Sequence, residues 1–242
     1  MLGLGVGFYR LGGNNSLVGT FSNKHSILLN GTTQYIDVDT AAGNINPSKG
    51  TFSAWVKFDS DRSNAIIIKA TVDSNNQISI AYINSSTKWR FTYKAGGTSK
   101  IAEVVTEEEV NKNWVHLAMT WDVEEDELKG YVNGTQQGGT ISSLGTFSGT
   151  INECYLGMNT LSNNSFFGGH VDEVSMFNEV VSVASLYNGG LPKDVEFSSL
   201  NGLIAYWRFT EGAGVTSVDE SANDNTATLI NNPTWSTLTV RE

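Results

Sequence analysis

The chain has 242 residues, a formal net charge of −10 at pH 7, 25 glycines and 3 prolines. This acidic balance argues against a nucleic-acid partner, because a nucleic-acid binder carries a basic face, and no apolar run of about 18 residues marks a membrane span. The lone Cys154 excludes an internal disulfide framework. The many glycines and few prolines favour a β sandwich of short strands joined by polar turns.

Residues 1–25 are a glycine-rich arm that carries isolated apolar side chains, among them Leu2, Val6 and Phe8. The arm has no positively charged start and no continuous apolar run, so it does not match a secretory signal. A segment of this kind cannot fold alone. Two alternatives remain: the arm is disordered, or it docks on a neighbouring subunit.

From Ser26 onward, apolar and polar residues alternate, which indicates β-strands. Two Asn-Gly pairs, Asn30-Gly31 and Asn133-Gly134, predict tight hairpin turns between neighbouring strands. Residues 181–190, with the sequence VSVASLYNGG, predict a short helix that ends at the final glycines. The pattern as a whole predicts an all-β fold.

Six segments follow one another in the order SILLNGTTQYIDV, GTFSAWVKF, NWVHLAMTWD, LKGYVNGTQQG, YLGMN and GGHVDEVSMFNEVVS. Together they resemble the laminin-G-like modules of the concanavalin A-like lectin/glucanase superfamily. The resemblance implies a jelly-roll sandwich of two antiparallel sheets, one of them concave. We expect Trp55, Trp114 and Trp121 to fill the space between sheets that pack about 10 Å apart.

Residues 202–235 open with GLIAYWRF, a buried-strand pattern, and continue through a loop rich in Asp and Asn. In the resembled modules a similar segment precedes the strand of Leu28, whereas here it follows the last family strand. Either it begins a truncated second module, or the chain is circularly permuted and residues 26–242 form one sandwich. We favour permutation, because an orphan half-module would expose apolar side chains. Permutation would bury three side chains beside Leu28 and Ile36, namely Ile204, Tyr206 and Trp207.

The carboxylates do not form a catalytic pattern. Asp122, Glu124 and Asp126 alternate in DVEEDE, where a solvated hairpin turn is expected. Asp172 and Glu173 are adjacent, so in a strand they would point to opposite faces. A retaining glycosidase needs two carboxyl groups about 5 to 5.5 Å apart. We therefore predict that the chain is not an enzyme.

An oxygen-rich loop is a candidate site for structural calcium. The segment DESANDN places Asp219, Ser221, Asn223 and Asn225 at alternating positions, and Ca²⁺ prefers carboxylate and amide oxygens. The same residue types are also ordinary turn formers. Asp172 is a second candidate, because the resembled modules often bind calcium near the matching acid.

A bound glycan would need exposed aromatic rings. Trp89, Phe91 and Tyr93 share one face of KWRFTYKA and form one candidate platform, and Phe166 and Phe167 form another in an Asn-rich loop. Burial in the core is the alternative interpretation for both sets.

The arm and the permuted order resemble structural proteins of tailed bacteriophages. This implies a non-catalytic virion surface protein, either a capsid decoration protein or a tail-fibre adhesin. It would contact other virion proteins or its own copies through the arm, and it would bind host-surface polysaccharide. One alternative is a secreted, extracellular carbohydrate-binding lectin module. A glucanase-like enzyme is the second alternative, and it would need the paired carboxylates that the sequence lacks.

Overall fold

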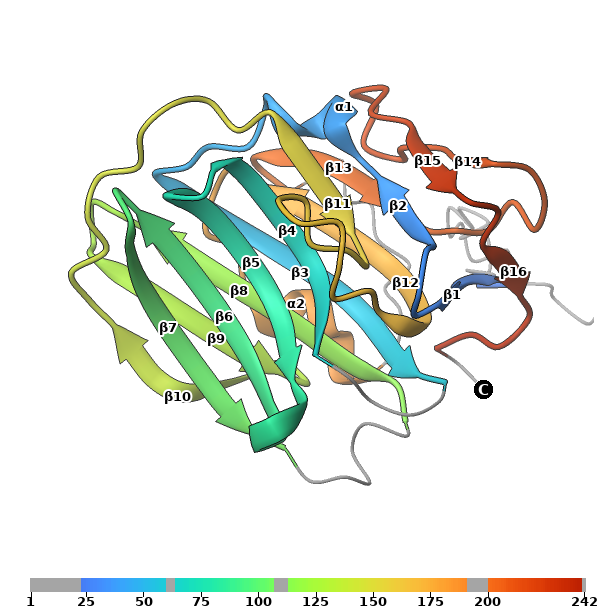
Figure 1. The fold of residues 1–242 in the computed structure, drawn as a ribbon, viewed down its shortest axis with the longest axis horizontal. Helices are drawn as coiled ribbons and strands as arrows, with labels where there is room; N and C mark the ends of the chain where they lie inside the picture. The colour runs from blue at the N-terminus through green and yellow to red at the C-terminus, as the bar shows by residue number, and fades with distance from the viewer. Residues whose placement is uncertain (1–22, 60–63, 107–112, 191–199, 241–242) are drawn as a thin grey trace, which may run out of the picture.

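The computed structural model describes residues 23–59, 64–106, 113–190 and 200–240. Within these residues the chain folds into two antiparallel sheets of eight strands each, packed face to face (Figure 1). The predicted all-β, two-sheet sandwich is confirmed.

We call one layer sheet A. Its strands lie in the order β10 (Thr135–Ile141), β9 (Glu127–Val132), β8 (Val115–Asp122), β3 (Lys49–Phe58), β12 (Gly168–Phe177), β1 (Ser26–Asn30) and β16 (Thr234–Ser236), and β13 (Leu203–Trp207) also pairs with β12.

The other layer is sheet B, which faces the viewer in Figure 1. Its strands lie in the order β14 (Thr216–Ser217), β15 (Ala227–Ile230), β2 (Tyr35–Asp37), β11 (Glu153–Leu156), β4 (Ala65–Asp73), β5 (Asn76–Ile83), β6 (Lys88–Ala95) and β7 (Thr98–Val105).

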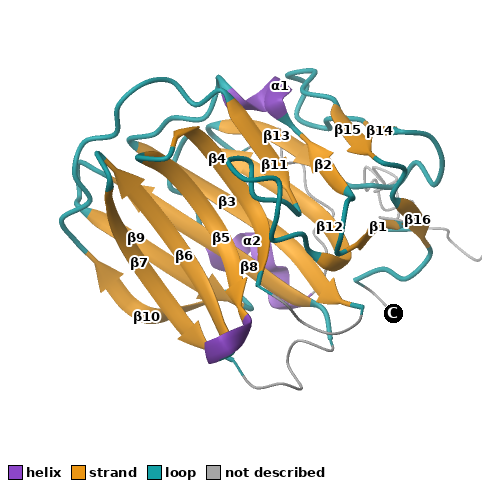
Figure 2. Ribbon diagram, viewed as in Figure 1, coloured by secondary structure: helices purple, strands orange, loops and turns teal. Residues whose placement is uncertain are grey.

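Helices are short and lie outside the two sheets (Figure 2). They are α1 (Asp39–Ala42), α2 (Val183–Tyr187) and the 3-10 turns η1 (Asn84–Ser86) and η3 (Asn188–Gly190). The predicted helix within residues 181–190 is confirmed by α2, whose first turn is capped by Ser182. No helix among the described residues is long and apolar enough to cross a membrane.

The alternating pattern of β3 explains how sheet A buries both faces. Phe52, Ala54 and Val56 belong to the core between the sheets. Trp55 points the other way and stacks on Tyr187 of α2, with ring centroids 5.7 Å apart. The expectation that Trp55 fills the space between the sheets is therefore wrong, because α2 covers the outer face of sheet A.

The other two tryptophans, Trp121 and Trp114, lie on opposite sides of sheet A. Trp121 is fully buried in the core, as predicted. Trp114 is half-buried and packs against His170 on β12, with centroids 5.9 Å apart. His170 alternates with the core residue Val171, so Trp114 lies on the outer side of sheet A and does not fill the space between the sheets.

The two Asn-Gly pairs have different outcomes. Asn133 and Gly134 adopt φ values of 50° and 75° and join β9 to β10 in a two-residue hairpin, as predicted. The hairpin predicted at Asn30 is wrong, because β1 and β2 lie in different sheets. The Asn30 carboxamide oxygen instead accepts hydrogen bonds from the backbone N–H groups of Thr32, Thr33 and Gln34, which shapes a crossover between the layers.

The segment after residue 200 contributes strands to both sheets. β13 pairs with β12, β15 pairs with β2 through Leu229 opposite Ile36, and β16 pairs with β1 through Thr234 opposite Leu28. The predicted burial is confirmed, with exposures of 3%, 2% and 0% for Ile204, Tyr206 and Trp207. Their strand lies beside β12, however, while β15 and β16 are the neighbours of Ile36 and Leu28. Circular permutation remains a prediction.

Candidate functional site

The outer face of sheet B carries a row of polar and aromatic side chains. The strand registers align the row Thr228, Asp37, Tyr155, Lys69, Ser79, Thr92 and Ile101. In β15, β2, β11, β4, β5 and β6, the residues on either side of this row, such as Ile36 and Leu156, are buried in the core. Because successive side chains of a strand alternate between faces, the row points away from the core.

Two tyrosines form the aromatic part of this face. The rings of Tyr35 on β2 and Tyr155 on β11 lie 5.0 Å apart at an interplanar angle of 45°, and both residues are half-buried. Burial, followed by the charges of Asp39 and Asp37, raises the pKa of Tyr155 to about 12. The phenol therefore stays neutral at physiological pH and keeps its hydrogen-bond donor.

A lysine lies next to the tyrosines in the row. Lys69 on β4 is 5% exposed, and its Nζ donates to Oδ1 of Asn159 at 2.7 Å. Burial, followed by the charge of Lys94, lowers the pKa of Lys69 to about 8. The ammonium group is therefore held in place and still mostly protonated near neutral pH.

Acidic side chains flank the tyrosines. Asp39 accepts a hydrogen bond from the backbone N–H of Cys154 at 2.6 Å, which fixes its carboxylate beside β11. Burial, together with the charges of Asp37 and Glu153, raises the pKa of Asp39 to about 6, although the hydrogen bond from Cys154 acts to lower it. Asp37 accepts the backbone N–H of Asp39 at 2.9 Å.

We call the set Tyr35, Asp37, Lys69, Tyr155 and Asn159 the tyrosine face. It combines aromatic rings with a carboxylate, an amide and an ammonium group on one rigid sheet. Rings and a few placed polar groups of this kind are typical of small-molecule sites. Sequence alone did not predict the face, because the order β2-β11-β4 that joins its residues is set by tertiary pairing. The available signal was Tyr155 alternating with the apolar Cys154 and Leu156.

The predicted aromatic platforms lie elsewhere. Trp89, Phe91, Tyr93 and Phe167 are all 0% exposed within the core, and Phe166 is half-buried. The first three lie on the face of β6 that packs toward sheet A. These four rings do not form an exposed platform, because burying their apolar surface in the core is more favourable than leaving it in contact with water.

The predicted calcium residues of the loop do lie together, but they bind the backbone. Asp219 Oδ1 accepts from the N–H groups of Tyr206 and Ser221, and Oδ2 accepts from Ser221 Oγ and the N–H of Asn225. The amides of Asn223 and Asn225 donate to the carbonyl of Ile204. The loop thus anchors β13, and its carboxylate is already satisfied by four donors. As arranged it does not fit a cation, and calcium binding remains a prediction.

Asp172 lies apart from that loop, in the middle of β12. It is 0% exposed and accepts from Asn23 Nδ2 at 2.8 Å and from the N–H of Glu173 at 3.0 Å. Burial, followed by the charge of Glu173, raises the pKa of Asp172 well above its ordinary value. Among the described residues, no group of three His, Cys, Asp or Glu side chains gathers to hold a metal ion.

The acidic turn joins β8 to β9, as predicted, and its carboxylates bind backbone groups of nearby loops. Asp122, however, is the last residue of β8 and is buried rather than solvated. Asp122 accepts from the N–H groups of Glu124 and Glu125, and Asp126 accepts from those of Ser143 and Leu144. These contacts shape turns, so they give the acids a structural role.

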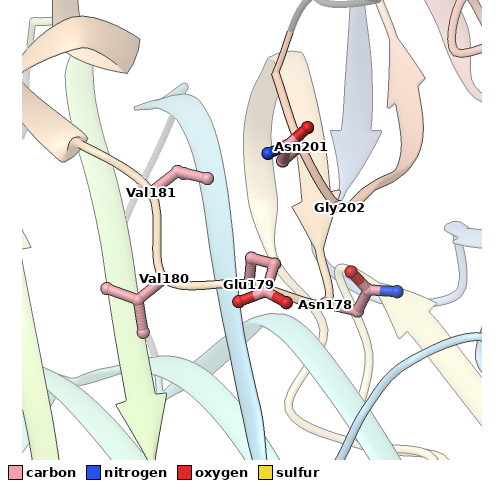
Figure 3. Close-up of a pocket in the computed structure, with 6 residues that line it drawn as sticks. All are labelled: Asn178, Glu179, Val180, Val181, Asn201 and Gly202. Carbon is pink, nitrogen blue, oxygen red and sulfur yellow. The ribbon is translucent and has the colours of Figure 1, made fainter.

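A separate hollow of about 520 Å³ lies between the segment after β12 and the turn before β13 (Figure 3). Asn178, Glu179, Val180 and Asn201 line it, and the N–H of Asn178 donates to the carbonyl of Gly202 at 2.8 Å. The described residues of its walls carry no aromatic ring, so the tyrosine face is the better candidate for ring recognition.

Comparisons with known proteins agree with this architecture. Residues 30–186 match the family model described as the concanavalin A-like lectin/glucanases superfamily, Laminin_G_3. No curated protein matches the chain.

Several solved structures share the fold. A candidate carbohydrate-binding protein from Bacteroides ovatus has a TM-score of 0.63 at 16% identity, and the match covers 90% of this chain but only 61% of that protein. The CBM40 domain of the Ruminococcus gnavus IT-sialidase, bound to α2,6-sialyllactose, has a TM-score of 0.56 at 16% identity, covering 69% of this chain and 96% of that one. A heptameric SAP-like pentraxin from Limulus polyphemus has a TM-score of 0.56 at 13% identity, covering 86% and 94%.

Proposed function

The chain belongs to the concanavalin A-like lectin/glucanase superfamily, and on that premise we propose that it is a non-catalytic carbohydrate-binding module whose glycan binds at the tyrosine face. One observation carries the proposal. The Tyr35 and Tyr155 rings lie together on an outward sheet face, and Tyr155 is in register with Lys69, whose ammonium group binds Asn159.

The chemistry of the face suits a sugar. An aromatic ring packs against the C–H face of a pyranose, while hydroxyl groups need both donors and acceptors. Tyr155 and Lys69 supply donors, and Asp37 supplies acceptors. Two of the proteins similar in fold are described by carbohydrate binding, which supports the proposal.

A glycan array tests this function with the full chain. We expect the wild-type protein to bind a limited set of glycans, and Tyr155→Ala to weaken that binding at least tenfold, which corresponds to about 1.4 kcal/mol. Tyr155→Phe keeps the ring and should retain most of the affinity. Tyr131→Ala on β9 of sheet A removes a half-buried tyrosine far from the face and serves as the control.

Two outcomes would contradict the proposal. In the first, no glycan binds to a folded protein. In the second, glycans bind equally to the wild type and to Tyr155→Ala.

The more specific role at a virion surface remains a prediction. It depends on the arm of residues 1–25, of which residues 1–22 lie outside the described residues. A carbohydrate-binding module is compatible with a virion adhesin and with a secreted lectin alike. Mass spectrometry of purified virus particles tests this role. Failure to detect the chain in them would exclude it.

A further inference from the structure

A second hollow, of about 270 Å³, lies on the outer side of sheet A. Three aromatic residues line it, Trp55 from β3, Trp114 before β8 and Tyr187 from α2, together with Lys57 and Asn133. Sheet B and the tyrosine face lie on the opposite side of the sandwich (Figure 2). This hollow is therefore independent of the proposed glycan site.

The aromatic walls are held in place before any ligand binds. Tyr187 stacks on Trp55 at an interplanar angle of 26°, and its centroid lies 5.7 Å from that of His116. Gly134 lies against the same ring, since a Cβ there would be 2.6 Å from Tyr187 Cδ1. Tyr187 is thus clamped from several sides, so its ring does not need to be ordered on binding.

The polar groups of the walls include the ammonium group of Lys57. The indole N–H of Trp114 is buried beneath the wall and has no hydrogen-bond partner among the described residues, so it does not face the hollow. Within the described part of the chain, Lys57 forms no ion pair. Among the described residues that line the hollow, Lys57 is the only charged one.

The titratable groups near the hollow do not neutralise the positive charge of Lys57. His170, beside Trp114, has a pKa lowered by burial and then by Lys57, so it is neutral at pH 7. Its Nε2 lies 3.9 Å from Oδ1 of Asp59, an acid that does not line the hollow. His116 is buried behind Tyr187, and burial lowers its pKa to about 3.

We propose that this hollow binds a single acidic sugar residue of the uronic acid class. Its carboxylate pairs with Lys57, and its ring packs against the aromatic walls. The volume is just below the range of about 300–1,000 Å³ found for drug-sized ligands, which suits one ring. A charge-assisted hydrogen bond is about twice as strong as a neutral one, so Lys57 sets the preference for an acid.

Calorimetric titration of the full chain with D-galacturonic acid and with D-galactose tests the proposal. The two sugars share a ring and differ in the carboxylate, so we expect one saturable site for the acid and at least tenfold weaker binding of galactose. Lys57→Met keeps the aliphatic stem and should lose at least tenfold in affinity for the acid. Trp114→Ala, which removes one of the aromatic walls, should also weaken binding.

Controls separate this site from the tyrosine face. Lys100→Met makes the same charge change on β7 of sheet B and should leave galacturonic acid binding unchanged, as should Tyr155→Ala. Equal affinity for the two sugars, no detectable binding of the acid, or unchanged binding by Lys57→Met would each overturn the proposal. Loss of binding through Tyr155→Ala would overturn it too, by placing the acid on sheet B. Melting curves of each variant verify that the protein is folded.

Discussion

Asp39 shows how one side chain connects the tyrosine face to stability. Its carboxylate holds the N–H of Cys154 and lies beside Asp37 and Glu153, and its pKa is raised to about 6 from an ordinary value of 3.8. The folded state therefore binds a proton more tightly than the unfolded chain. The stabilisation is complete below about pH 4 and is lost as pH rises through about 6.

Asp39→Asn tests this link, because the amide keeps an oxygen for Cys154 and cannot ionise. Between pH 4 and 7 we expect the wild type to lose about 1 kcal/mol more unfolding free energy than the variant, after discounting for solvent screening of this half-buried group. Urea denaturation at several pH values measures the difference. Parallel pH profiles of the two proteins would show that Asp39 is not responsible.

The strands could be predicted from the sequence where apolar and polar residues alternate clearly. The neighbours of each strand in the sheets could not. Phe52, Ala54 and Val56 share the core face of β3, because the period of two depends only on local geometry. The hairpin predicted at Asn30 fails because the side chain binds three backbone N–H groups and turns the chain into the other sheet. Tyr35 and Tyr155 escaped prediction for a related reason, since only the insertion of β11 between β2 and β4 brings them together.

The contact between the two sheets depends on a glycine in β9. A Cβ at Gly130 would overlap the ring of Phe91, which is 0% exposed on β6 of the opposite sheet. We expect Gly130→Ala to destabilise the fold by about 1–3 kcal/mol, the usual cost of overpacking. Adding Phe91→Leu to Gly130→Ala should recover part of the lost stability. Chemical denaturation of the single and double variants measures both free energies of unfolding.

Gly43→Ala is the matched control for that prediction. Gly43 follows α1 with a φ of −64°, and a Cβ there would meet nothing within 4 Å. Equal stability changes for Gly130→Ala and Gly43→Ala would mean that the sheets do not approach as closely as the structure indicates.

Within the whole molecule, the described ends of the chain lie side by side. Ser26 pairs with Ser236, and its Oγ donates to the carbonyl of Leu238 at 2.7 Å. The strands after residue 200 complete both sheets, so the protein needs them wherever they stand in the sequence. Chain ends that lie close together make circular permutation tolerable.

A rearranged chain tests this at the scale of the fold. It would run from 200 to 242, continue through a short Gly/Ser linker, and then run from 1 to 199. We expect it to fold and to bind the same glycans. Its free energy of unfolding should lie within about 1 kcal/mol of the wild-type value, because a change of loop length costs little. A second rearrangement that opens the chain between Asp172 and Glu173 would cut the central strand β12, which pairs with β1, β3 and β13, and should not fold. If the first chain fails to fold, the order of the segments matters for more than their pairing, and the permutation hypothesis is wrong.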